Sequence, residues 1–331
     1  ETVVYATEAF TPVASQALPV GMIGGIRWSP DGRHMLFNFY DDTRNADVWM
    51  WSREDDRAWR IVESPSVIAS EDCVSATAFR YTSFDGLEVP AFIYMPRGTT
   101  GPVPAIINIH GGPEGQYRPG FNGLFQYFVS RGYAVIAPNV RGSTGYGKTY
   151  QSLDDVRKRM DSVRDLAALH AYLAARGDIA PDKIALVGGS YGGYMVLAGL
   201  AFFPELWAAG VNIVGISNLV TFLENTAGYR RALREAEYGS LVHDREFLES
   251  VSPLNYVDAI KAPLFIIHGA NDPRVPLSEA EQMHAALVER GTPSQLLVYQ
   301  DEGHGIAKLK NRLDAYPKVA DFLDAHLRGG A

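Results

Sequence analysis

One short segment limits the fold of this chain more than any other. The run Gly188-Gly189-Ser190-Tyr191-Gly192-Gly193 follows an apolar stretch at 184–187 and precedes a helical pattern that begins near Tyr191. A strand that turns this sharply into a helix has no room for side chains two residues before and after its apex, and glycine at 188 and 192 fits a G-x-S-x-G turn. Such a turn exposes the Ser190 hydroxyl above a helix N-terminus, which favours a developing negative charge.

From about residue 78 onward, apolar segments alternate with helical patterns. The predicted strands are 78–82, 88–94, 105–109, 134–137, 183–187, 210–214, 264–268 and 295–299. Several are uninterrupted apolar runs, as in parallel strands that are covered on both faces. The predicted helices are 121–131, 154–176, 191–201, 278–290 and 315–327. Strands followed by helices predict a doubly wound, mostly parallel sheet, and the Ser190 turn makes this an α/β-hydrolase fold.

The segment before this region has a different pattern, with short strands broken by polar turns. Its predicted strands are 26–28, 34–40, 48–51 and 59–62, and Ser29-Pro30-Asp31-Gly32 is a strong turn signal between the first two. Strands of this length within roughly 40 residues match the size of one β-propeller blade. We therefore predict a β-rich N-terminal segment with its linker over 1–74 and a catalytic domain over 75–331.

A serine nucleophile needs a base, and the base needs an acid that orients it. In an α/β-hydrolase the acid and then the histidine follow the serine, at the ends of later strands. Asp272 comes shortly after the predicted strand 264–268, and His304 comes after 295–299, between two glycines. The sequence therefore predicts a triad of Ser190, Asp272 and His304. His268 precedes Asp272, the wrong order for this triad, and is interpreted as a strand-end residue.

Stabilising an oxyanion requires two hydrogen-bond donors. The first is expected to be the backbone N–H of Tyr191, the residue after the nucleophile. The second is expected from the loop His110-Gly111-Gly112-Pro113, which follows the predicted strand 105–109. A metal site made of His268, Asp272 and His304 lacks a ligand-rich motif, so no metal and no cofactor are predicted.

These motifs together resemble the prolyl oligopeptidase family of serine peptidases, and in particular its acylaminoacyl peptidase-like branch. The resemblance is carried by the motifs His110 to Pro113, Arg141 to Gly147, Gly188 to Tyr194, Asp272 to Pro276 and Gly303 to Gly305, which occur in the family's order. It implies the same triad, an oxyanion donor in the Gly112 N–H, and a substrate carbonyl bound by Arg274. The alternative for Arg274 is a surface ion pair. Prolyl oligopeptidase itself has a tyrosine where His110 stands, so no tyrosine hydroxyl is carried over.

The chain also departs from this family. Members carry a complete N-terminal propeller that restricts access to short peptides, whereas about one blade precedes the catalytic region here. The chain begins at Glu1, and is expected to be either the C-terminal part of a longer peptidase or a natural short form. The predicted function is cleavage of peptide bonds, acylaminoacyl- or oligopeptidase-like, through an acyl-serine intermediate. A carboxylesterase acting on small acyl esters is the alternative, and a non-catalytic binding scaffold is disfavoured because all three triad residues are present.

The charge and composition of the chain limit the kinds of partner that it is expected to bind. The net charge is -8 and the basic residues form no block, which argues against nucleic acid. No stretch reaches the ~18 apolar residues of a membrane span. The one cysteine, Cys73, excludes an intrachain disulfide and fits a cytoplasmic protein, with periplasmic or secreted locations left open. The expected partner is a short peptide or small acyl substrate, and an unpaired blade edge is a route to a homo-oligomer.

Overall fold

The computed structural model describes residues 2–6, 11–16, 18 and 21–329. It divides into two compact units, one made of Glu1–Ala76 with Arg118–Tyr127, the other of Thr77–Tyr117 with Phe128–Ala331. The predicted division at residue 74 lies close to the first of these boundaries. The inclusion of Arg118–Tyr127 in the first unit has no counterpart in the sequence pattern.

The described part of the first unit is mostly β-strand, with one 3₁₀ turn (Ser70–Asp72) and the start of helix α1 (Gly123–Ser130). It contains a hairpin and a four-stranded antiparallel sheet in the order β3-β4-β5-β6. The strands are β1 (Thr2–Ala6), β2 (Thr11–Gln16), β3 (Met22–Trp28), β4 (His34–Tyr40), β5 (Asp47–Ser52) and β6 (Arg57–Val62). On β4, Met35, Phe37 and Phe39 alternate inward and pack with Trp51 of β5. The sheet matches the small blade-like element that the sequence predicts.

Segment 118–127 joins this unit through one glutamine side chain. Gln126 Oε1 accepts a hydrogen bond from the Val74 N–H (2.8 Å), and its Nε2 donates to the carbonyls of Val74 (2.9 Å) and Asp42 (3.2 Å). The Asp42 carboxylate in turn accepts from the Ala76 N–H (2.6 Å). An amide that bonds three backbone groups is a tertiary contact that no local periodicity reveals.

The second unit is built on an eight-stranded sheet in the order β14-β13-β12-β11-β9-β10-β8-β7. Strands β9 to β14 are mutually parallel, whereas β7 and β8 pair antiparallel at one edge. The bounds are β7 (Thr77–Thr82), β8 (Glu88–Tyr94), β9 (Val103–Ile109), β10 (Ala134–Pro138), β11 (Ile179–Gly189), β12 (Ala209–Ile213), β13 (Leu264–Gly269) and β14 (Ser294–Tyr299). The predicted α/β-hydrolase fold with a mostly parallel sheet is confirmed.

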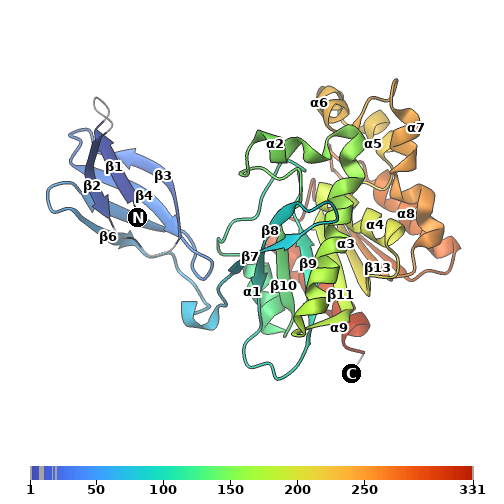
Figure 1. Ribbon diagram of the computed structural model, residues 1–331, viewed down its shortest axis with the longest axis horizontal. Coiled ribbons are helices and arrows are strands. Elements are labelled where there is room, and N and C mark those ends of the chain that lie inside the picture. Colours follow the sequence, from blue (N-terminus) through green and yellow to red (C-terminus); the bar gives the residue numbers. More distant parts are fainter. Residues whose placement is uncertain (1, 7–10, 17, 19–20, 330–331) are drawn as a thin grey trace. The chain divides into compact units, whose positions relative to one another are not determined.

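Helices cover both faces of this sheet. They are α1 (Gly123–Ser130), α2 (Lys148–Gln151), α3 (Arg159–Arg176), α4 (Tyr191–Phe202), α5 (Leu219–Asn225), α6 (Gly228–Tyr238), α7 (Arg245–Ser250), α8 (Ser278–Glu289) and α9 (Leu309–Leu327). Strand β13 shows the alternation, since Leu264 and Ile266 join the main core while Phe265 packs on Phe322 of α9, with ring centroids 5.5 Å apart. In Figure 1, α3 and α9 both lie beside β11, which they contact.

Two expectations about helices need correction. Helix α3 begins at Arg159 rather than at 154, because Ser152–Asp154 and Val156–Lys158 form two 3₁₀ turns separated by extended Asp155. The second turn starts with Val156 at φ 46°. Helix α9 begins at Leu309 rather than 315 and contains Pro317. The stretch 215–253, which has no readable motif, forms α5, α6 and α7.

Candidate active site

Ser190 stands at the sharp junction between β11 and α4. Its backbone has φ 58° and ψ -119°, a conformation that residues other than glycine rarely adopt. The Ser190 N–H donates to the Ile213 carbonyl of the neighbouring strand (2.9 Å), and its carbonyl accepts from the Tyr194 N–H one helical turn on (3.1 Å). The strained residue is therefore held from the strand side and from the helix side, as in a nucleophile elbow.

The glycines around Ser190 are required by close backbone contacts. A Cβ added at Gly188 would lie 2.3 Å from the Gly192 carbonyl oxygen, and one added at Gly192 would lie 2.2 Å from that of Ile109. Gly189 differs, because its nearest neighbour, the Ile213 oxygen, would be 3.7 Å away. The two glycines that the motif singles out are thus those that sterics demand.

Asp272 and His304 form a hydrogen-bonded pair. His304 Nδ1 lies 2.7 Å from Asp272 Oδ2, and Asp272 Oδ1 accepts from the N–H groups of Arg274 (2.8 Å) and Val275 (3.1 Å). Burial alone would raise the pKa of Asp272, but these hydrogen bonds outweigh it and hold the pKa below its usual value. The carboxylate is therefore ionised and can fix the tautomer of His304.

The loop that carries His304 approaches β13 closely. A Cβ added at Gly269, the last residue of β13, would lie 2.1 Å from the Gly303 carbonyl oxygen. Gly305 has φ 115°, a conformation that favours glycine, whereas a Cβ at Gly303 would meet nothing closer than 3.7 Å. The close approach of this loop to β13 therefore depends on Gly269, whereas Gly305 is needed for its backbone conformation.

Ser190, Asp272 and His304 follow β11, β13 and β14, which are parallel and lie in one half of the sheet. Their side chains consequently extend from the same carboxyl edge, where ligands of open α/β sheets bind. No hydrogen bond joins Ser190 Oγ to His304 in the part of the chain that the structure describes. Catalytic hydrogen bonds of this kind commonly tighten only when substrate binds.

His268 is buried beside the acid. Its Nε2 lies 2.9 Å from the Val275 carbonyl oxygen and 3.7 Å from Asp272 Oδ2. Burial lowers the pKa of His268, so the ring is neutral and its Nε2 donates to that carbonyl. His268 belongs to β13, and its bond to the Val275 carbonyl ties the loop that carries Asp272 to this strand. This position agrees with its interpretation as a strand-end residue.

The two expected oxyanion donors flank the nucleophile. A Cβ added at Gly111 would lie 3.3 Å from Ser190 Cβ, so the loop after β9 touches the elbow directly. Among the described residues, neither the Gly112 N–H nor the Tyr191 N–H has a hydrogen-bond acceptor. The loop is fixed by His110, whose Nε2 lies 2.9 Å from Ser143 Oγ. Both donors are therefore free to bind a substrate oxygen.

Arg274 lies two residues after the acid and is exposed. Its backbone is tied down, since its N–H donates to Asp272 and its carbonyl accepts from Thr226 Oγ1 (2.9 Å). Its guanidinium forms no ion pair with any residue that the structure describes. The side chain is thus available to a ligand from a rigid position.

The hydrogen bonds of the segment after β12, at the same edge of the sheet, could not be predicted from the sequence. Asn218 caps α5 by accepting from the N–H groups of Val220 (2.9 Å) and Thr221 (3.3 Å). Buried Glu279 of α8 accepts from the N–H groups of Ser217 (3.0 Å) and Asn218 (2.9 Å). A buried carboxylate that organises a loop 61 residues away leaves no signature in a local window.

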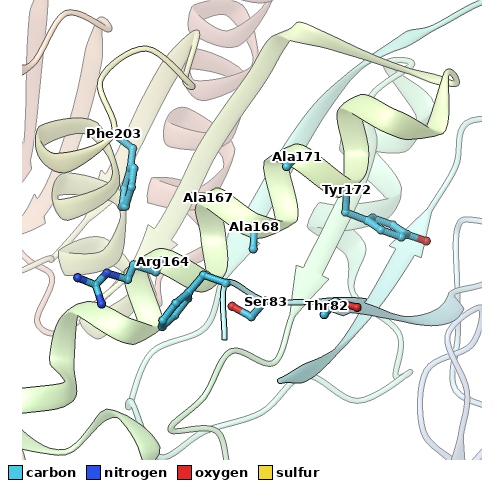
Figure 2. Close-up of a pocket in the computed structure, with 9 residues that line it drawn as sticks. Thr82, Ser83, Arg164, Ala167, Ala168, Ala171, Tyr172 and Phe203 are labelled. Atoms are coloured by element: carbon cyan, nitrogen blue, oxygen red, sulfur yellow. The ribbon is translucent and has the colours of Figure 1, made fainter. Parts of the chain in front are cut away.

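Two hollows lie outside the triad. A groove of about 630 Å³ is lined by Thr82, Ser83, Phe84, Arg164, Ala167, Ala168, Ala171, Tyr172 and Phe203, and Figure 2 shows Ala168 and Tyr172 on successive turns of α3. The guanidinium carbons of Arg141 and Arg164 both lie over the Phe84 ring, 4.7 Å and 5.2 Å from its centroid. A smaller one, about 300 Å³, lies between Glu114 of the oxyanion loop and Arg234 of α6. No predicted site residue lines either hollow.

One acidic group has the spacing of a cation site. Carboxylate oxygens of Asp154, Asp155 and Glu237 lie within 4.8 Å of one another. The buried guanidinium of Arg159 already pairs with Asp154 and with Glu237 (2.6 Å). A cation thus already occupies two of the three carboxylates, so the donor set does not suit a metal ion.

The sequence of this chain is similar to those of known peptidases. Residues 119–330 match the sequence profile of the Prolyl oligopeptidase family. The chain is 29% identical to "Dipeptidyl peptidase family member 6" of Caenorhabditis elegans, over 94% of this chain and 46% of that protein. It is 35% identical to "Dipeptidyl aminopeptidase BIII" of Pseudoxanthomonas mexicana, over 75% of this chain and 38% of that protein. The chain thus spans less than half the length of these curated relatives.

Solved structures agree with the fold. A puromycin-hydrolyzing peptidase of Mycobacterium tuberculosis matches with a TM-score of 0.91 at 25% identity, over 99% of this chain and 50% of that chain. The acylaminoacyl peptidase of Pyrococcus horikoshii matches with a TM-score of 0.85 at 24% identity, over 96% of this chain and 51% of that chain. None of the described helices has both the length and the apolar character needed to span a bilayer.

Proposed function

Because the chain belongs to the prolyl oligopeptidase family of serine peptidases, we propose that it cleaves peptide bonds with Ser190 as nucleophile, His304 as general base and Asp272 as the orienting acid. The observation that carries this proposal is the 2.7 Å bond between His304 Nδ1 and Asp272 Oδ2. It occurs at the carboxyl edge of the strands where Ser190 occupies a strained elbow.

The reaction has two halves. Ser190 Oγ attacks the carbonyl carbon of the scissile bond while His304 Nε2 takes its proton, and the tetrahedral intermediate collapses as the histidine gives that proton to the leaving amine nitrogen. Water then attacks the acyl-serine, with His304 again accepting and returning a proton, so that a carboxylic acid leaves and Ser190 is regenerated. Asp272 stays ionised throughout and stabilises the imidazolium.

Two backbone groups and one side chain are proposed to hold the substrate. The N–H groups of Tyr191 and Gly112 donate to the oxyanion, which is supported by their lack of other partners among the described residues. Arg274 binds a carbonyl of the acyl part of the substrate. Its free guanidinium supports this role over that of a surface ion pair.

The proposed substrates are short peptides, either N-acylated or with a free amino end. The relatives and structural neighbours include dipeptidyl and acylaminoacyl peptidases, so both types of substrate belong in the test. We propose that 75–331 is the catalytic domain and that 1–74 is a propeller-blade-like segment. The machinery also suits small acyl esters, whose leaving groups are better than amines.

The test compares three substrates: an N-acyl-aminoacyl p-nitroanilide, a dipeptidyl p-nitroanilide with a free amine, and a p-nitrophenyl acyl ester. Ser190→Ala is the test variant, and Ser250→Ala, an exposed serine at the end of α7, is the matched control. Turnover of an anilide that is lost only in Ser190→Ala would support a peptidase. Turnover of the ester alone would make the protein an esterase, and anilide turnover that survives in Ser190→Ala would contradict the nucleophile assignment.

A further inference from the structure

The tyrosine next to the nucleophile is anchored deep in the core. Tyr191 is 1% exposed, and its hydroxyl accepts a hydrogen bond from Arg159 Nη1 (3.0 Å) and donates to Asp154 Oδ2 (3.1 Å). A third hydrogen bond joins it to Ser162 Oγ (2.8 Å). A phenolic hydroxyl has one proton and two acceptor sites, so these partners use its full capacity. The proposed triad accounts for none of the three partners.

Two of these partners, Arg159 and Asp154, are ionisable groups at full burial. Arg159 is 0% exposed, pairs with Asp154, and donates through Nη2 to the Glu237 carboxylate (2.6 Å) and carbonyl (2.8 Å). Its guanidinium carbon also lies over the rings of Tyr191 (5.1 Å) and Tyr238 (4.8 Å). Buried ion pairs lose so much hydration that apolar replacements are often as stable or more so. Stability is therefore a weak reason for charges here, and geometric specificity is a better one.

The arrangement leaves the hydroxyl little freedom. The Asp154 carboxylate is pressed against Gly142, where an added Cβ would lie 2.3 Å from Oδ1. On the other side, the Tyr194 ring stacks on the Tyr191 ring, with centroids 5.8 Å apart and planes inclined by 22°. Asp154, the α3 residues Arg159 and Ser162, and Tyr194 thus confine the phenol from three elements.

The confined side chain belongs to the first residue of α4, directly after Ser190 with its φ of 58°. The N–H of a first helical residue has no partner within the helix. Its peptide plane is held on the other side by the Ser190 carbonyl, which accepts from the Tyr194 N–H (3.1 Å). A shift of the Tyr191 ring that its χ torsions do not absorb moves its Cα, and with it the adjoining peptide plane and this N–H. Fixing the far end of the phenol therefore limits the directions in which the N–H can point.

We propose that Asp154, Arg159 and Ser162 are positioning residues that act through the Tyr191 hydroxyl to aim the Tyr191 N–H at the oxyanion. The inference rests on the proposed function, in which that N–H binds the tetrahedral intermediate. An oxyanion donor acts mainly in the transition state. Loss of the anchor consequently lowers kcat and weakens transition-state analogues while leaving KM nearly unchanged.

The test variant is Tyr191→Phe, which deletes the shared hydroxyl and keeps the ring and the backbone. Tyr133→Phe is the matched control, because Tyr133 is equally buried but its hydroxyl donates to Asp324 Oδ1 (2.5 Å), outside this anchor. We expect Tyr191→Phe to lower kcat roughly tenfold, less than the 10²–10³-fold loss on removing a whole oxyanion donor. The Ki of a peptide boronate, which forms a tetrahedral adduct with the serine, should rise by the same factor, and KM should change less than about twofold.

Several outcomes would overturn the inference. These are Tyr191→Phe with wild-type kcat and Ki, a loss of kcat without a matching rise in Ki, and an equal loss in Tyr133→Phe. Ser162→Ala removes one partner of the hydroxyl and leaves the ion pairs intact. It should lower kcat and raise Ki by a smaller factor than Tyr191→Phe, and it remains a test even if Tyr191→Phe does not fold. A wild-type protein that neither hydrolyses the anilides nor binds the boronate would refute the proposed function and this inference together. Wild-type activity with unaffected variants would refute the inference alone.

Discussion

Replacing Asp272 with asparagine tests the hydrogen-bond pattern around His304. Asp272 Oδ1 accepts from two N–H groups, those of Arg274 (2.8 Å) and Val275 (3.1 Å), while Oδ2 accepts from His304 Nδ1 (2.7 Å). In Asp272→Asn the amide oxygen must take the Oδ1 position, since the alternative would set an NH₂ against two N–H donors. The NH₂ group then faces Nδ1, which becomes an acceptor, and the imidazole proton moves to Nε2.

A histidine with its proton on Nε2 cannot accept the Ser190 proton. We expect kcat for an anilide substrate to fall about 10⁴-fold, as for the same change in a serine protease triad, or about 5.5 kcal/mol of transition-state stabilisation. The assay is steady-state release of p-nitroaniline. Asp301→Asn is the matched control, because Asp301 is in the His304 loop but pairs with Lys308 (2.9 Å) and Lys310 (2.8 Å) instead of with the histidine.

The control variant should keep kcat within about twofold of the wild type, because exposed ion pairs contribute little. A loss of less than tenfold in Asp272→Asn would refute the tautomer argument. An equal loss in both variants would show that loop distortion, and not the tautomer, limits the reaction.

Three further predictions concern the glycines of the elbow, the buried carboxyl of Asp154 and the exposed side chain of Arg274. Gly192→Ala, whose Cβ would lie 2.2 Å from the Ile109 oxygen, should abolish activity and lower Tm, whereas Gly189→Ala, with 3.7 Å of room, should keep most of both; equal effects in the two variants would contradict the elbow geometry. Burial raises the pKa of Asp154 to about 7 against a usual 3.8, so the folded state binds this proton more tightly than the unfolded state does. Urea unfolding from pH 5 to 7 should show wild type losing about 1.4 kcal/mol per pH unit relative to Asp154→Asn, and a pH-independent difference would count against that raised pKa. Arg274→Met should raise KM for peptide anilides about tenfold with little change for a small ester, and an equal change for both would argue against a carbonyl contact.

Elements whose signals are local were predictable. Each predicted strand of the sheet matches an observed strand to within a few residues, because buried parallel strands are apolar runs bounded by turn residues. Ser190, Asp272 and His304 could be placed from chain order and strand ends, and Asp272 and His304 are in hydrogen-bond contact. Their catalytic roles remain a prediction.

What the sequence concealed depends on contacts between distant segments. The helical spacing of apolar residues continues upstream of Arg159, but Val156 at φ 46° breaks the helix, and no residue pattern announces that turn. The loop at Ser217 and Asn218 is organised by Glu279, and the phenol of Tyr191 by Asp154 and Arg159. Periodicity records which face of an element is buried, whereas it cannot tell which buried polar groups meet.

The central claim is that Ser190 is the nucleophile, and covalent labelling tests it most directly. The protein is treated with a fluorophosphonate, which phosphonylates an activated serine and releases fluoride, and the adduct is located by peptide mass mapping. We predict one phosphonyl group on the peptide that contains Ser190, no labelling of Ser190→Ala, and greatly slowed labelling of His304→Ala. Labelling at another residue, or undiminished labelling of Ser190→Ala, would contradict the account.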